Sequence, residues 1–127
     1  MSIDPRDLEK VIQAIIVDRS EIQWKPGKAQ PHLAKRIRLG HLPENSTLAN
    51  YEAVIANVKS NQKANVYAYI YDRIIYPTLT AMVEDRLWLV MMSMDGILKT
   101  SFPPDNPSEY LNSNYFVYLG IMEELLS

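Results

Sequence analysis

A change in hydrophobic period at Asn65 constrains the fold of this chain more than any other feature. Before Asn65, apolar residues recur every three or four positions, which places them on one side of an α-helix. From Asn65 to Tyr71 the pattern alternates, with Val66, Ala68 and Ile70 set against three tyrosines. Alternation is the period of a β-strand. The sequence therefore predicts helices in its first half and a sheet in its second half.

Helix-capping residues predict where the helices of the first half begin. They are expected to start at Asp4–Pro5, at Pro31, and at Ser46 or Thr47. Gly40 can end the second helix, because glycine adopts the left-handed conformation that often follows a helix. The third helix is expected to fade at Ser60–Asn61.

Turn residues divide the second half into four expected strands, at 65–71, 74–83, 86–93 and 97–102. Asp95–Gly96 is a strong signal for a two-residue hairpin between apolar runs. Pro103–Pro104 ends the last strand, and a closing helix is expected over 116–126. The predicted fold is α+β: an antiparallel four-stranded sheet packed against N-terminal helices, with a C-terminal helix.

The whole-chain properties favour one ordinary domain. The 127 residues are expected to form a single domain, and the chain contains no cysteine. No apolar run is long enough to cross a bilayer, so we expect a cytoplasmic protein with no membrane partner. The sequence has no glycine-rich phosphate loop and no group with metal-ligand spacing, so neither a metal nor a cofactor is expected.

One short segment concentrates positive charge and both histidines. Between Lys25 and His41 there are five lysines or arginines and no acidic residue, although the formal net charge of the chain is -2. Clustered cations attract phosphates, and histidine suits proton transfer near neutral pH. His32, Lys35 and Arg36 stand at i, i+3 and i+4, so they are expected to share a helix face.

Histidine, lysine and arginine can supply the groups that metal-independent RNA cleavage needs. A base must take the 2′-hydroxyl proton, an acid must protonate the leaving 5′ oxygen, and cations must offset the negative charge on the phosphorane. His32 and His41 could transfer the protons, while Lys35, Arg36 or Arg38 could bind phosphate. The alternative is a solvated basic surface with two unremarkable histidines.

The strands offer further candidates for substrate contact. Strict alternation would place Leu98, Thr100 and Phe102 on one face of the last strand and Ile97, Lys99 and Ser101 on the other. The amine of Lys99 and the hydroxyl groups of Thr100 and Ser101 could contact a phosphate. Tyr67 and the two tyrosines that follow it at alternate positions could stack on bases. The alternative is that all of them are ordinary strand residues.

Several short motifs together resemble one nuclease family. The runs are His32-Leu33-Ala34-Lys35-Arg36, His41-Leu42-Pro43-Glu44 and Thr100-Ser101-Phe102-Pro103-Pro104, with the alternating tyrosines between them. They resemble the barnase, colicin and RelE-like superfamily of phage and toxin nucleases. The resemblance implies RNA cleavage without a metal on a small antiparallel sheet flanked by helices. The family's histidines lie closer together in sequence than His32 and His41 do.

We therefore expect a metal-independent endoribonuclease, a toxin of a toxin–antitoxin or phage-related system. Its expected partners are RNA and an antitoxin or immunity protein. The expected catalytic residues are His32, Arg36, His41 and Thr100, and the expected substrate-binding residues are Lys35, Arg38, Lys99, Ser101 and Tyr67. The acidic second half of the chain supports another hypothesis, a non-catalytic protein-binding module such as an immunity protein or antitoxin. A third is nucleic-acid binding without chemistry.

Overall fold

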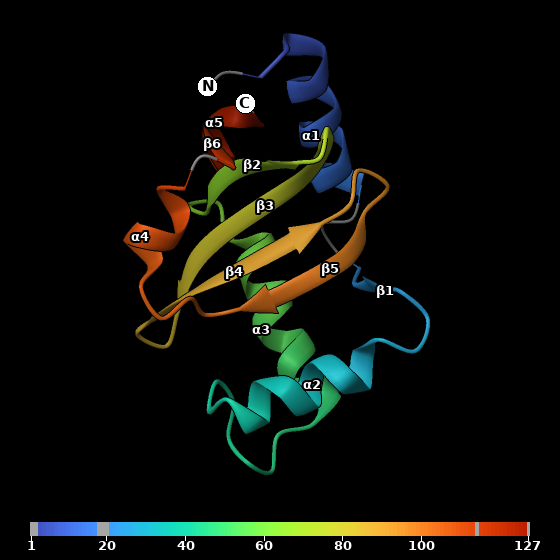
Figure 1. Cartoon of the computed structure of the whole chain (residues 1–127), viewed down its shortest axis with the longest axis vertical. Coiled ribbons are helices and arrows are strands. Elements are labelled where there is room, and N and C mark those ends of the chain that lie inside the picture. Colours follow the sequence, from blue (N-terminus) through green and yellow to red (C-terminus); the bar gives the residue numbers. More distant parts are fainter. Residues whose placement is uncertain (1–2, 18–20, 114, 127) are drawn as a thin grey trace.

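The computed structural model describes residues 3–17, 21–113 and 115–126, and it has an α+β fold (Figure 1). The helices are α1 (Pro5–Val17), α2 (Ala29–Arg38), α3 (Leu48–Ser60), α4 (Pro107–Leu111) and α5 (Met122–Leu125). The strands are β1 (Gln23–Trp24), β2 (Asn65–Tyr71), β3 (Ile74–Val83), β4 (Arg86–Met92), β5 (Ile97–Phe102) and β6 (Phe116–Ile121).

These strands form one mixed sheet in the order β1-β5-β4-β3-β2-β6. The four central strands are the expected antiparallel ones, joined in sequence by tight turns. In the first two turns, Asp72–Arg73 and Glu84–Asp85 adopt positive φ angles, as a two-residue hairpin turn of the favoured type requires. Each edge of this central sheet gains a strand. The two-residue β1 pairs in parallel with β5, and β6 pairs antiparallel with β2.

The expected four-stranded, purely antiparallel sheet is therefore only roughly correct, and the closing helix is wrong over most of its length. Phe116–Ile121 is strand β6, and only Met122–Leu125 is helical. The physical reason is the open edge of β2, whose backbone groups gain hydrogen-bond partners when β6 pairs with it. Strand β1 was not predicted either, because its two residues are too few to show an alternating pattern.

The pairing of the strands defines two distinct faces of the sheet. One row of paired residues consists of Val66, Leu79, Val90 and Ser101. The first three of these belong to the hydrophobic core, which also contains residues of α1 and α3. The neighbouring row consists of Tyr67, Thr78, Met91 and Thr100, and it points the other way. We call this second side the open face, because α3 lies behind the strands in Figure 1 and covers the other side. The central residues of the open face, Thr78 and Met91, are nevertheless buried.

A β-bulge at Lys99 breaks the alternation expected for β5. Met92 pairs with Leu98 while its neighbour Met91 pairs with Thr100, so Lys99 is an extra residue in this strand. Leu98 consequently joins the core, and Thr100 lies on the open face. The expected grouping of Leu98 with Thr100 is therefore wrong. Lys99 is exposed, with its ammonium 4.8 Å from the ring centre of Tyr76.

Tyr51 joins helix α3 to the sheet. Its ring is fully buried, and its hydroxyl donates a hydrogen bond to the backbone oxygen of Ser101 at 2.6 Å. The ring packs between the indoles of Trp24 and Trp88, with centroids 5.6 and 6.4 Å away. Burial raises the pKa of Tyr51 to about 12, so the phenol stays a hydrogen-bond donor at neutral pH. These contacts fix the position of β5 relative to α3.

We predict that Tyr51→Phe lowers the free energy of unfolding by about 1 to 3 kcal/mol, the usual cost of removing the partner of a buried polar group. The phenyl ring preserves the packing, so the loss reports the hydrogen bond. Urea denaturation followed by circular dichroism measures it. Tyr71→Phe is the control, because Tyr71 is 55% exposed and its substitution should change stability little. Equal stabilities for the two variants would contradict the prediction.

Candidate functional site

The end of helix α2 brings His41 back beside Arg36. Gly40 has a φ of 75°. The amide of His41 donates to the carbonyl of Arg36 at 2.8 Å, and the amide of Gly40 donates to Ile37 at 3.0 Å. This is the hydrogen-bond pattern of a Schellman motif. The turn reverses the chain, so Nη1 of Arg36 lies 3.2 Å from Nδ1 of His41 and can donate to it.

Arg36 is a buried cation without an acidic partner among the described residues. Its side chain is only 3% exposed, and its Nε makes no hydrogen bond there. The guanidinium lies over the ring of Phe102, 5.4 Å from the ring centre. Burial lowers the pKa of Arg36, because desolvation disfavours the charged form. A buried charge of this kind is costly unless it is paired, and an anionic ligand would pair it.

Arg36 and His41 line a cavity of about 340 Å³ between α2, β5 and the segment after β5. We call it the Arg36 hollow. Its remaining lining comes from Lys35, Leu39, Thr100, Phe102, Pro103, Pro104 and Asp105. Four residues expected at the site therefore meet in one place: Lys35, Arg36, His41 and Thr100. They come from two segments about sixty positions apart.

The surroundings of His41 favour a neutral imidazole. Burial and the nearby guanidinium groups of Arg36 and Arg86 lower the pKa of His41 from its ordinary value of 6.5, while the carboxylate of Asp105 acts in the opposite direction. At pH 7 the neutral form of the ring therefore predominates. With Nδ1 accepting from Arg36, the proton of the neutral ring lies on Nε2.

His32 lies in a second cavity, of about 480 Å³, which we call the His32 hollow. Its lining includes Lys25, Lys28, Tyr76 and Lys99. The imidazole packs on Trp24, with ring centroids 5.7 Å apart. Burial, with Arg36, Lys35 and Lys28, lowers the pKa of His32. The structure therefore does not bring the two histidines into one hollow, although both hollows lie between α2 and β5.

The other expected site residues lie outside the Arg36 hollow. The Ser101 side chain is fully buried, in the row that packs toward the core. Arg38 is exposed on α2. Lys99 lines the His32 hollow, and Tyr67 packs on the open face against Phe116 and Tyr118.

Phe102 and Asp105 both line the Arg36 hollow, although the sequence did not predict a site role for either. Asp105 was grouped only with the acidic second half, and Phe102 was noted as a strand residue and as part of the run that resembles the nuclease family. Asp105 follows Pro103–Pro104, which keep the chain extended beyond β5. Its position just past the end of the strand that carries Thr100 is the signal that could have placed it at the site.

No family model, curated protein or solved structure matches this chain. The interpretation of the site therefore depends on its geometry. Across 3–17, 21–113 and 115–126, no three His, Cys, Asp or Glu side chains cluster in a way that could hold a metal ion. Over the same ranges, no helix has the length and apolar character needed to cross a membrane.

We predict that Gly40→Ala lowers the free energy of unfolding by about 1 to 2 kcal/mol, the cost of a left-handed residue with a Cβ atom. No atom lies within 4 Å of that Cβ, so the cost is conformational. The disturbed turn should also loosen the pair of Arg36 and His41, and the pKa of His41 should rise toward 6.5.

Gly27→Ala is the matched control, because Gly27 has a φ of 76° and is equally uncrowded. It should cost a similar amount of stability without changing the titration of His41. NMR titration of the imidazole resonances distinguishes the variants. An unchanged pKa of His41 in Gly40→Ala would show that the turn does not position this residue.

Proposed function

We propose that the protein is a metal-independent endoribonuclease that acts in the Arg36 hollow. The observation that carries the proposal is the buried guanidinium of Arg36, which lacks an acidic partner in the described chain and lies beside a neutral imidazole. A phosphodiester supplies the missing negative charge, and guanidinium matches phosphate geometry well. Thr100 provides a hydroxyl in the same hollow, and Lys35 a second cation.

The proposed reaction begins when Arg36 turns from His41 to the phosphate. This frees the lone pair of Nδ1, which accepts the proton of the 2′-hydroxyl. The 2′ oxygen bonds to phosphorus, and the bond from phosphorus to the 5′ oxygen breaks. Lys35 donates a proton to the leaving oxygen. The products are a 2′,3′-cyclic phosphate and a 5′-hydroxyl end, and the carboxylate of Asp105 stabilises the imidazolium that forms.

In this proposal the His32 hollow binds a neighbouring phosphate of the same RNA strand. His32 and Arg36 are four residues apart on α2, a helical rise of about 6 Å. Lys28 and Lys99 add positive charge from the loop before α2 and from the bulge of β5. His32 therefore contributes to RNA binding, in place of the proton transfer expected from the sequence.

The setting that we propose is a cytoplasmic toxin held inactive by an antitoxin or immunity protein. Support comes from the resemblance to toxin nucleases and from the open Arg36 hollow, which an acidic partner could fill. Induced expression should stop cell growth, and His41→Gln should relieve the arrest. If the wild-type protein and His41→Gln arrest growth to the same extent, the proposal of a toxin that acts by RNA cleavage is contradicted.

We predict that the purified protein cuts RNA in the presence of EDTA, and that His41→Gln slows cutting by ~10² to 10⁴-fold, as expected for loss of a general base. Glutamine can still accept a hydrogen bond from Arg36, so the variant tests proton transfer. Single-turnover cleavage of a labelled single-stranded RNA measures the rate, and end analysis detects the cyclic phosphate.

His32→Ala is the comparison variant, and it should weaken RNA binding with a smaller effect on the rate at saturating protein. If RNA stays intact with the wild-type protein, the endoribonuclease proposal fails. Salt-sensitive RNA retention without cut ends would then identify an RNA-binding protein. Full activity in His41→Gln would exclude His41 as the base.

We predict that the cleavage rate is constant from about pH 7 upward to mildly alkaline pH and falls on acidification. A base acts only when it is unprotonated, and the pKa of His41 is lowered below 6.5. The decline should therefore be centred below pH 6.5 and follow one proton. A rate profile at constant ionic strength tests this, and a decline centred above pH 6.5 would contradict the assignment.

A further inference from the structure

The open face of the sheet carries an extended aromatic network. The chain has eight tyrosines and two phenylalanines. All of them except Tyr51 are linked by ring contacts with centroids 4.8 to 6.4 Å apart. Several rings remain accessible: Tyr110 is 38% exposed, Tyr115 48% and Tyr71 55%. Accessible aromatic surface of this extent is typical of a binding site.

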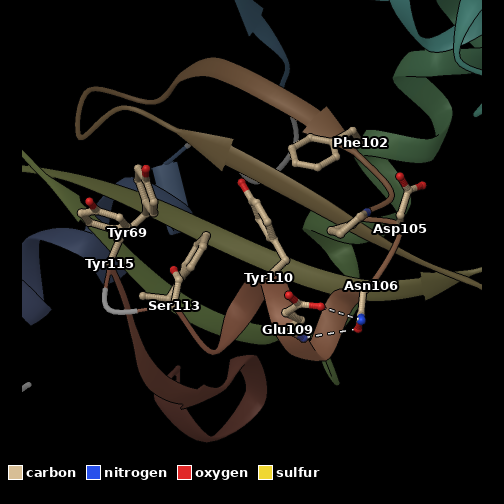
Figure 2. A pocket seen from close by; sticks show the side chains of 10 residues that line it. Tyr69, Phe102, Asp105, Asn106, Glu109, Tyr110, Ser113 and Tyr115 are labelled. Atoms are coloured by element: carbon tan, nitrogen blue, oxygen red, sulfur yellow. Dashed lines mark hydrogen bonds between the residues drawn. The ribbon is translucent and has the colours of Figure 1, made fainter.

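Part of this network encloses a pocket of about 580 Å³, which we call the aromatic pocket. Its aromatic lining consists of Tyr69, Phe102, Tyr110, Tyr115 and Phe116. Figure 2 shows the rings of Tyr69, Phe102, Tyr110 and Tyr115 gathered around the pocket, with Asp105, Asn106 and Glu109 at one side. The Asn106 amide donates to the Glu109 carboxylate at 3.0 Å, so this side is polar. The pocket therefore combines flat apolar surfaces with hydrogen-bonding groups.

The aromatic pocket adjoins the Arg36 hollow. Phe102, Pro104 and Asp105 line both cavities. The ring of Phe102 receives Arg36 over its face and contacts Tyr110 edge-on at 5.6 Å. One side chain therefore separates a cationic site from an aromatic one. A nucleotide has the same division, with a charged phosphate and a flat base a few bonds apart.

We propose that the aromatic pocket binds an unpaired base of the RNA strand whose phosphate lies in the Arg36 hollow. This inference rests on the proposed function and names the substrate class, single-stranded RNA. Bases stack on aromatic side chains when they are unpaired, whereas a duplex keeps its bases stacked inside. Burial raises the pKa of Tyr110, so its phenol is neutral at pH 7 and does not repel the strand.

The test measures binding to an RNA that cannot be cut. A fluorescein-labelled 2′-O-methyl oligonucleotide lacks the attacking hydroxyl, so fluorescence anisotropy reports affinity independently of catalysis. Tyr110→Ala should weaken binding about 5- to 150-fold, the range for loss of one base stack. Tyr110→Phe, which keeps the ring, should bind within about twofold of the wild type. Tyr115→Ala, a second variant at an exposed position, should also weaken binding.

Tyr118→Ala is the matched control. Tyr118 lies on the same face and is 54% exposed, but it is not part of the pocket lining. Its substitution should leave the affinity unchanged. Circular dichroism of all variants checks that they are folded.

Two results would overturn the inference. One is wild-type affinity in both Tyr110→Ala and Tyr115→Ala, which would indicate that the aromatic pocket binds a protein partner and not an RNA base. The other is equal affinity for the single strand and for a duplex of the same sequence. If the wild-type protein does not cleave RNA, but Tyr110→Ala and Tyr115→Ala bind RNA more weakly than the wild type, the endoribonuclease proposal is refuted. The proposal that the aromatic pocket binds a base then still stands.

Discussion

The hydrogen bond from Tyr51 to the backbone of Ser101 is the constraint on which the site depends. It ties α3 to β5 inside the core, and Trp24 and Trp88 hold the ring on both sides. Helix α2 packs on α3, so its distance from β5 follows from this attachment. Both hollows lie between α2 and β5 and would change shape if the attachment were lost.

The buried guanidinium of Arg36 is a positive charge that its surroundings compensate only in part. Its guanidinium is withdrawn from water, and a neutral imidazole and an aromatic ring offer weaker compensation than a carboxylate. Such a charge is tolerated when the surrounding fold supplies enough stability elsewhere, and it is relieved when an anion binds. The same Phe102 ring that receives the cation also borders the aromatic pocket. Charge and stacking surface therefore meet at the end of one strand.

The sequence predicted the central hairpins well, because alternation and turn residues are local signals. It missed β6, where an apolar run suited either helix or strand and the open edge of β2 decided the outcome. It also predicted the wrong face of the sheet for Leu98. The bulge at Lys99 depends on how β4 and β5 pair, so the sequence of β5 alone does not reveal it. Lys35, Arg36, His41 and Thr100, which the sequence analysis grouped together, line one hollow. His32, which composition and the family resemblance placed with them, lines another.

Local sequence patterns specify which groups are available: a segment rich in cations with two imidazoles, a strand with a hydroxyl, and a row of tyrosines. Gly40 also fixed the end of α2, because a left-handed residue there is a local requirement. Which of these groups meet depends on packing between distant segments of the chain. Contacts between α2 and β5 join positions far apart in the chain, and no local pattern specifies them. The packing of Tyr51 thus placed Arg36 and His41 opposite Thr100 and assigned His32 to a separate hollow.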